Sequence, residues 1–214
     1  MKWIALAIIA AGACLLFKQA GASQREPGDP PAETDTQETT LFEELQVQAE
    51  SIMTEPAPPS DDATRQTNRS AFLDMLAYSE GTSGPNGYKT MFGGRTFESF
   101  ADHPRVFAPF TDKTGKQNVT SAAGRYQFLA KTWDSLRDKL QLPDFGPESQ
   151  DAAALELVRQ RGALEDVDAG LLESAVRKCA PIWASLPGAG YNQPERKFAQ
   201  LKGAYIGAGG TVAA

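Results

Sequence analysis

Apolar and polar positions divide the chain into three regions. An unbroken apolar run covers residues 3–17, a region dense in Pro, Asp, Glu, Thr and Ser covers residues 23–69, and helical spacing of apolar residues dominates from residue 70 onward. An apolar run after a lysine is typical of a signal or anchor segment, whereas the polar region cannot bury enough apolar surface to offset its ordering entropy. The pattern predicts a membrane-directed segment (1–22), a disordered acidic tether (23–67) and one folded domain (68–214).

The folded domain is predicted to begin with a short amphipathic helix that ends at an acidic residue, Glu80. Apolar or small residues recur at helical spacing in this run, at Ala71, Phe72, Met75, Leu76 and Ser79. Asn68 or Ser70 is the expected N-cap, and Gly81 is expected to stop the helix. The sequence therefore places Glu80 where an apolar helix emerges from the core.

The remaining pattern predicts an α+β fold, mostly helical, with one small antiparallel sheet beside the first helix. Gly93-Gly94 lies between two aromatic arms and predicts a hairpin over residues 88–100. Helical spacing then returns in three stretches, at 121–140, from Pro147 and at 171–183, and a last helix is expected from Pro194 to about Gly207. The stretch 186–193 interrupts the helices as a loop.

Charge is distributed unevenly along the chain. The net charge is −6, and residues 23–69 carry eleven acidic residues against three arginines, whereas acids and bases balance from residue 70 onward. A neutral folded part argues against a nucleic-acid partner, which needs a concentrated basic face. Two distant cysteines, Cys14 and Cys179, and a single histidine, His103, give neither a disulfide framework nor a zinc-ligand cluster. We therefore expect no metal and no cofactor.

Glu80 is the first candidate for chemistry. A carboxyl at the end of a buried helix is partly desolvated, and desolvation raises its pKa toward the value that a general acid needs at neutral pH. The alternative is an ordinary solvated glutamate at a helix end. The nearest other carboxyl, Asp102, lies in Asp-His-Pro-Arg, which favours a turn in which Asp102 caps backbone amides and pairs with Arg105. His103 is then expected to be a hydrogen-bonded structural residue.

Six stretches in the same order resemble the lambda-type endolysin family of lytic transglycosylases, over about residues 68–212. They are Ser79-Glu80-Gly81-Thr82, Gly93-Gly94 with Phe97, Asp102-His103-Pro104-Arg105, Ala123-Gly124-Arg125-Tyr126-Gln127, Arg161-Gly162-Ala163-Leu164, and residues 183–191, whose letters are WASLPGAGY. The resemblance implies a lysozyme-like fold and cleavage of the bond between N-acetylmuramic acid and N-acetylglucosamine in peptidoglycan, leaving 1,6-anhydro ends. The loops at 82–93 and 109–120 differ in length from that family's pattern, which leaves the number of sugar subsites open.

The same resemblance implies roles for individual residues. Glu80 matches the catalytic glutamate, and a T4-type aspartate nine residues later is absent because Lys89 stands there. Gly124 and Gln127 resemble the Gly-x-x-Gln element, in which the glycine permits close helix packing and the glutamine contacts sugar or orients the glutamate. Tyr191 resembles the tyrosine that closes the cleft, and Ser79 and Asn192 are expected to contact glycan. Alternatives are a surface glutamine for Gln127 and a core-packed tyrosine for Tyr191.

Three functions compete at this stage. The first is an exported phage or prophage endolysin, a monomer that acts on glycan strands for host lysis. The others are a membrane-tethered wall-remodelling transglycosylase of a secretion or conjugation system, and a non-catalytic wall-binding module. A hydrolysing muramidase is the alternative chemistry. Residues 1–22 are expected to hold the enzyme in the inner membrane with its domain in the periplasm, and to be released upon depolarisation, cleaved after Ala22 or kept as a stable anchor.

Overall fold

The computed structural model describes residues 61–213, and the predictions for segment 1–22 and for the tether up to residue 60 lie outside this range. The elements in chain order are α2 (Asp62–Glu80), the 3-10 turn η1 (Gly87–Lys89), β1 (Ala108–Thr111), β2 (Gln117–Thr120), α3 (Ala130–Leu140), α4 (Pro147–Gln160), α5 (Leu164–Asp168), α6 (Leu172–Cys179) and α7 (Phe198–Gly207). The described part is therefore mostly helical with one two-stranded antiparallel sheet, as the sequence predicts. Between residues 61 and 213, no helix is long and apolar enough to cross a membrane.

Helix α2 begins earlier than the sequence pattern indicates. Asp61 is its N-cap, with a carboxylate that accepts from the backbone N–H of Thr64 at 2.6 Å. The expected N-caps at Asn68 or Ser70 are wrong, and residues 62–67 of the expected tether are helical. The physical reason is tertiary: the Asn68 side chain is buried and bonds to the carbonyl of Asp168 and to Thr211, 143 residues later. An asparagine used in this way is unavailable as a cap.

The sheet does not lie where the glycine pair suggests. Around Gly93-Gly94 the chain makes a tight turn with a single bridge between Thr90 and Thr96. The two-stranded sheet is instead formed by β1 and β2, with Ala108 opposite Thr120 and Thr111 opposite Gln117. A short turn connects the two strands. Asp112 closes it, because one carboxylate oxygen accepts from the backbone N–H groups of both Thr114 and Lys116.

The helical predictions are correct in outline and differ at their ends. Pro147 opens α4 as expected and α7 ends at Gly207, but α7 begins at Phe198, four residues after Pro194. The expected helix 121–140 is helical only from Ala130. Residues 123–128 form a tight turn closed by an isolated bridge between Ala123 and Phe128. Leu171–Trp183 contains the shorter helix α6.

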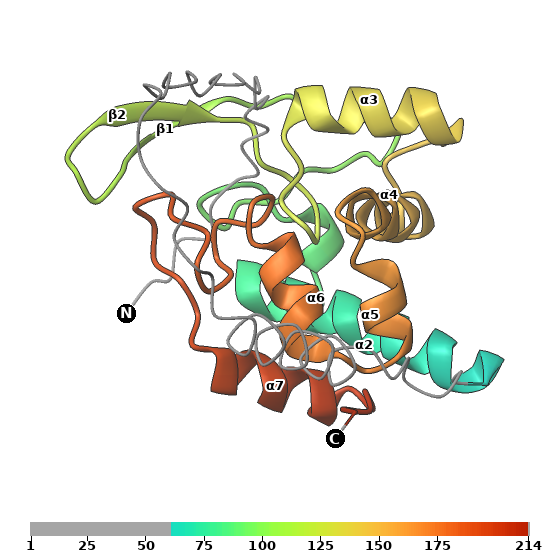
Figure 1. Cartoon of the computed structure of the whole chain (residues 1–214). Coiled ribbons are helices and arrows are strands. Elements are labelled where there is room, and N and C mark those ends of the chain that lie inside the picture. The colour runs from blue at the N-terminus through green and yellow to red at the C-terminus, as the bar shows by residue number, and fades with distance from the viewer. Residues whose placement is uncertain (1–60, 214) are drawn as a thin grey trace, which may run out of the picture. The chain divides into compact units, whose positions relative to one another are not determined.

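The core surrounds α2. Large fully buried side chains from separate stretches meet there, among them Phe72, Tyr126, Phe128, Trp133, Phe145 and Trp183. Helix α2 packs against α4, α5 and α7, and α3 packs against α4. Figure 1 shows α3 and the β1–β2 hairpin at the end of the domain opposite α7. Burial of each of these aromatic rings contributes on the order of 2–3 kcal/mol to stability.

Candidate active site

Glu80 is the last residue of α2, and its side chain is fully buried. Gly81 then adopts a left-handed conformation (φ 75°), and the N–H of Thr82 donates back to the carbonyl of Ala77 at 2.8 Å. This glycine stop lets the chain leave the helix directly after the acidic residue. The sequence prediction that Gly81 ends the helix and leaves a desolvated carboxyl at its end is confirmed.

One oxygen of the Glu80 carboxyl is bonded and the other is not. Ser185 Oγ donates to Glu80 Oε1 at 2.6 Å and lies 3.0 Å from Ser79 Oγ. Ser79 itself donates to the carbonyl of Leu76 at 2.8 Å. Glu80 Oε2 is buried and has no hydrogen-bond partner within residues 61–213. Because Oε1 is held by a donor, Oε2 is the oxygen that can carry and transfer a proton.

The surroundings of Glu80 favour its neutral form. Burial raises the pKa of this carboxyl to about 8, against the smaller opposing effects of the Ser185 hydrogen bond and of the positive charge on Arg196. A carboxyl with this pKa is mostly protonated at neutral pH, which is the state that a general acid requires.

Replacing Ser185 by alanine is expected to move the activity profile to higher pH. The hydroxyl bonds to the charged form of Glu80, so its loss raises the pKa of Glu80 further and the protonated acid persists to higher pH. The measurement is the rate of the expected glycan cleavage against pH for the variant and the wild-type protein. A shift of the alkaline limb to lower pH would contradict this arrangement.

The turn Gly124–Gln127 forms a second part of the site. Gly124 has a φ of 80°, and a Cβ added to it would lie 2.3 Å from Gln150 Oε1. The same Gln150 oxygen accepts from the N–H of Arg125 at 2.8 Å, so the Gln150 side chain fills the space that a larger residue would need. The expectation that Gly124 lies in a helix is wrong. The tight packing expected of this glycine is present, but it occurs in a turn, and contact of Gly124 with glycan stays a prediction.

Gln127 is buried rather than a surface residue. Its side-chain nitrogen donates to the carbonyls of Gly124 at 2.8 Å and Thr90 at 3.0 Å, while its side-chain oxygen is buried without a partner in the described part of the chain. Its φ is 51°, a conformation that is costly for a residue with a side chain. The turn therefore fixes a carboxamide whose oxygen accepts no hydrogen bond from the described residues, and contact of Gln127 with glycan stays a prediction.

Two hydrogen bonds tie this turn to the other segments of the site. Thr82, two residues after Glu80, donates through Oγ1 to the carbonyl of Arg125 at 2.5 Å. The indole of Trp183, two residues before Ser185, donates to the carbonyl of Tyr126 at 3.2 Å. The end of α2, the turn 124–127 and the segment 183–197 are thus held together, although they come from three distant parts of the chain.

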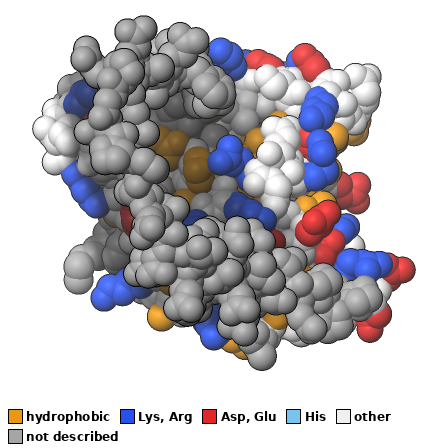
Figure 2. Space-filling model, in the orientation of Figure 1, with side chains coloured by type: hydrophobic (Ala, Val, Ile, Leu, Met, Phe, Trp, Pro, Cys, Tyr) orange, Lys and Arg blue, Asp and Glu red, His pale blue; other side chains and the backbone are white. Residues whose placement is uncertain are grey.

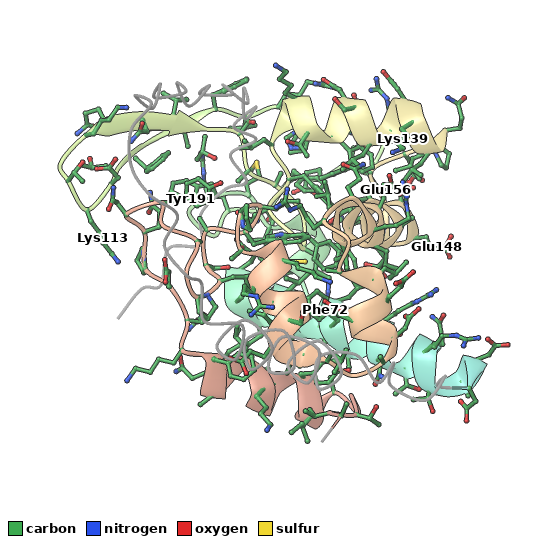
Figure 3. The ribbon with its side chains drawn as sticks, viewed as in Figure 1. Phe72, Lys113, Lys139, Glu148, Glu156 and Tyr191 are labelled. Carbon is green, nitrogen blue, oxygen red and sulfur yellow. The ribbon has the colours of Figure 1, made fainter. Side chains whose placement is uncertain are left out.

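Tyr191 and Asn192 lie in the loop that follows Ser185. The hydroxyl of Tyr191 donates to the carbonyl of Pro181 at 2.6 Å, and its side chain is half-buried. Asn192 is exposed, in a left-handed conformation, and its carbonyl accepts from the backbone N–H of Lys113. The ammonium of Lys113 also donates to the carbonyl of Gln193 at 2.6 Å, so the tip of the β1–β2 hairpin and this loop are linked (Figure 3). The glycan contacts of Tyr191, Asn192 and Ser79 stay predictions.

Asp102 and His103 are structural, as the sequence suggests. Asp102 accepts from the N–H of His103, from the indole of Trp133 and from Arg105. Burial acts to raise the pKa of Asp102, but these donors outweigh it and the pKa falls to about 2. His103 Nδ1 accepts from the N–H of Arg105, so Nε2 carries the proton and donates to the carbonyl of Phe128. Both groups are engaged in holding the turn.

Other carboxyl groups near α2 are also engaged. Asp74 pairs with Arg125, and Asp151 accepts from the hydroxyls of Tyr88 and Tyr126. Among the described residues, no cluster of His, Cys, Asp and Glu has the arrangement of a metal site. On the right-hand part of the face drawn in Figure 2, acidic and basic side chains lie side by side. Glu80 is therefore distinguished by its burial and by its free oxygen.

Sequence reasoning missed two residues of the site, Ser185 and Arg196. Ser185 stands in the stretch 183–191 that resembles the endolysin family, but its local pattern gives no sign that it meets Glu80, 105 residues earlier. Arg196 lies between a loop and a helix, where an arginine ordinarily faces solvent. Only the fold brings its guanidinium to the end of α2, where it donates to the carbonyl of Tyr78 at 3.2 Å.

Comparison with known proteins shows the family to which this chain belongs. The family model described as Endolysin matches residues 70–212. The chain belongs to the endolysin family. It is 46% identical over 150 residues to the endolysin of Escherichia phage lambda, an alignment that covers 67% of this chain and 92% of that protein. It is 43% identical over 159 residues to the endolysin of Escherichia phage P2, covering 68% of this chain and 95% of that one.

Solved structures of a relative show the same fold. A structure titled as bacteriophage lambda lysozyme complexed with a chitohexasaccharide matches with a TM-score of 0.64 at 44% identity, covering 69% of this chain and 97% of that one. A second structure, titled lysozyme from bacteriophage lambda, matches with a TM-score of 0.61 at 44% identity. The endolysin described here therefore has a lysozyme-like fold of the lambda type.

Proposed function

We propose that this endolysin is a lytic transglycosylase that cleaves the bond between N-acetylmuramic acid and N-acetylglucosamine in peptidoglycan and leaves 1,6-anhydro ends. The observation that carries the proposal is the environment of Glu80: a buried, neutral carboxyl with a free Oε2 and, among residues 61–213, no second carboxyl coupled to it. The lambda lysozyme structure with a bound chitohexasaccharide supports an oligosaccharide of N-acetylated sugars as the ligand class.

A single carboxyl suffices for this chemistry. Hydrolysing glycosidases ordinarily use two carboxyl groups, one as acid and one as nucleophile or base. In the proposed reaction, Glu80 Oε2 gives its proton to the glycosidic oxygen as the bond to C1 of the muramic acid breaks. The C6 hydroxyl of the same muramic acid then bonds to C1 and returns its proton to Glu80. The same side chain acts as acid and then as base, and no water is consumed.

The other candidate carboxyl is poorly suited to a second role. Asp102 accepts from three donors and its pKa is about 2, so it is committed to holding its turn. Gln127 and the ring of Tyr191 are proposed to bind the glycan, and Gly124 to keep the turn of Gln127 in place. Ser79 and Asn192 are proposed to contact the glycan strand at the edge of the site. The Ser79 hydroxyl lies against that of Ser185.

Mass analysis of digested sacculi tests the reaction. Each cut by a transglycosylase yields an anhydro end that weighs one water less than a hydrolytic end. Products with only hydrolytic ends would replace this proposal with a hydrolysing muramidase, and the absence of any released glycan would favour a wall-binding module. Genes for holins and spanins beside this gene would favour host lysis over wall remodelling.

We further propose that residues 1–22 hold a monomeric enzyme in the inner membrane, with the catalytic domain in the periplasm, until the membrane is depolarised. The supporting features are the short apolar run, its Ala and Gly content and Lys18 at its outer edge. Intact mass and fractionation before and after dissipation of the potential test this proposal. An uncut chain should move from the membrane to the soluble fraction, whereas a mature N-terminus at Ser23 before depolarisation would show cleavage instead.

A further inference from the structure

Arg196 contacts the end of α2 from a distant part of the chain. It lies in the connection between α6 and α7, which runs back past α2 (Figure 1). Its guanidinium donates through Nη2 to the carbonyl of Tyr78 at 3.2 Å and through Nε to the carbonyl of Ser79 at 3.4 Å. The same group stacks over the Tyr78 ring, with 4.9 Å between Cζ and the ring centroid. Three contacts thus attach one side chain to the two residues before Glu80.

These contacts complete the hydrogen bonding of the carbonyl groups at the end of α2. The last carbonyls of a helix lack intrahelical partners, and a cation near them is favourable because the helix dipole ends there with partial negative charge. The last turn of α2 contains no basic residue. The Ala77 carbonyl accepts from Thr82, the Tyr78 carbonyl accepts from both Gly81 and Arg196, and the Ser79 carbonyl accepts from Arg196. Arg196 therefore supplies the cationic C-terminal cap of the helix that carries Glu80.

The backbone of Arg196 contacts the second partner of Glu80. Its N–H donates to the carbonyl of Ser185 at 2.7 Å, and the hydroxyl of Ser185 donates to Glu80 Oε1. One residue thus holds both sides of the Glu80–Ser185 hydrogen bond, through its guanidinium on α2 and through its backbone on the Ser185 segment.

We propose that Arg196 is the positioning residue of this active site, fixing the Glu80 carboxyl against Ser185 and placing a positive charge beside it. The proposal deepens the function proposed above and rests on Glu80 as the acid. Its physical content is twofold. The fork of the guanidinium sets geometry, which a lysine cannot reproduce. The charge sets how readily Glu80 ionises, which a lysine can largely keep.

The charged side chains considered on α2 and on the elements packed against it are paired, hydrogen-bonded or exposed. On α5, Asp168 is paired with Arg69. On α4, Asp151 is bonded to two tyrosine hydroxyls, and on α2 itself Asp74 is paired with Arg125. On α7, Lys202 is exposed. Within residues 61–213, Arg196 is the charged side chain whose field acts appreciably on the Glu80 carboxyl, and it opposes the effect of burial.

The experiment follows the Glu80 carboxyl by ¹³C NMR in the full-length protein with labelled glutamate, without substrate, and measures the pH profile of wall cleavage in parallel. Three variants are compared with the wild-type protein: Arg196→Gln, Arg196→Lys and, as a matched loss of charge on an exposed face of α6, Arg177→Gln. Circular dichroism and thermal unfolding monitor the fold of each.

For Arg196→Gln we expect the titration midpoint of Glu80 and the alkaline limb of activity to move up by at least about half a pH unit, since a nearby cation is lost. The rate at pH 6 should also fall about tenfold, because the reacting groups are less well placed. Arg196→Lys should keep the midpoint near the wild-type value and still lose rate at pH 6. Arg177→Gln should change neither quantity.

Two results would overturn the inference. One is a Glu80 midpoint in Arg196→Gln equal to that of the wild-type protein, or shifted no more than in Arg177→Gln. The other, which applies even if Arg196→Gln does not fold, is a folded Arg196→Lys with a wild-type rate at pH 6. Because the titration needs no substrate, it separates this inference from the proposed reaction. If the Glu80 midpoint shifts in Arg196→Gln but the Glu80→Gln variant stays active, the proposed reaction is refuted, whereas the effect of Arg196 on the Glu80 carboxyl still stands.

Discussion

Replacing Glu80 by glutamine is expected to lower wall-cleaving activity by about 100-fold or more, the range that a positioned general acid contributes. Glutamine has nearly the same shape and can keep a hydrogen bond with Ser185, but it cannot release and recover a proton. The measurement is release of soluble glycan from purified sacculi at pH 6–7. Glu148→Gln, an exposed position in the first turn of α4, is the matched control and should retain wild-type activity. A Glu80→Gln protein that clears sacculi at nearly the wild-type rate would refute the assignment.

The same variant is expected to be more stable than the wild-type protein at alkaline pH. Glu80 is fully buried and its pKa in the fold, about 8, is raised above the ordinary value of 4.5. Below pH 4.5 the carboxyl is protonated in both the folded and unfolded states, so it has no effect. Between pH 4.5 and pH 8 the unfolded state releases the proton and the folded state keeps it. The free energy of unfolding of the wild-type protein therefore falls by a few kcal/mol, on the order of 4, as pH rises through this range.

Thermal unfolding at pH 5 and pH 9 measures this effect. The difference in Tm between Glu80→Gln and the wild-type protein should grow in favour of the variant as pH rises, whereas Glu148→Gln should follow the wild-type protein at both values. A difference in Tm that stays constant from pH 5 to pH 9 would show that Glu80 is not held neutral by the fold.

Replacing Gly124 by alanine is expected to destabilise the domain by about 3 kcal/mol. Two costs combine: a side chain at a φ of 80° costs about 1–2 kcal/mol, and a Cβ placed 2.3 Å from Gln150 Oε1 forces repacking at a further cost of about 1–3 kcal/mol. Gln150 cannot yield freely, since its amide nitrogen donates to the carbonyls of Tyr88 and Phe145. A fall in Tm of roughly 6–12 °C is the expected readout.

Gly162→Ala is the control for Gly124→Ala. Gly162 also has a positive φ, 64°, but no atom of the described residues lies within 4 Å of the Cβ that it would gain, so its substitution carries the conformational cost alone. Chemical denaturation of both variants should give a clearly larger loss for Gly124→Ala. Equal losses would mean that Gln150 moves aside easily and that close packing is not the reason for glycine at position 124.

Local patterns in the sequence determine much of what is seen here. The apolar stripe before Glu80 and the glycine after it require a helix that ends at a carboxyl, because 3.6-residue spacing buries one face and a left-handed residue stops the turn. Pro147 opens α4 for an equally local reason, since its fixed φ suits the first helical position. The Asp102 turn is also set by neighbours, Arg105 and the N–H of His103.

The tertiary structure decided the features whose partners are distant in the chain. Asn68 has the sequence position of an N-cap, but its side chain accepts from the backbone N–H of Thr211. Residues 123–128 have helical spacing yet form a turn, because Gln150 accepts from a backbone N–H of the turn and the Thr90 carbonyl accepts from the side chain of Gln127. Likewise, the carboxyl of Glu80 was visible in the sequence, whereas its contacts with Ser185 and Arg196 were not. Spacing along the chain shows which residues share one face of a helix. Only tertiary packing determines that segments 105 or more residues apart in the sequence meet around the Glu80 carboxyl.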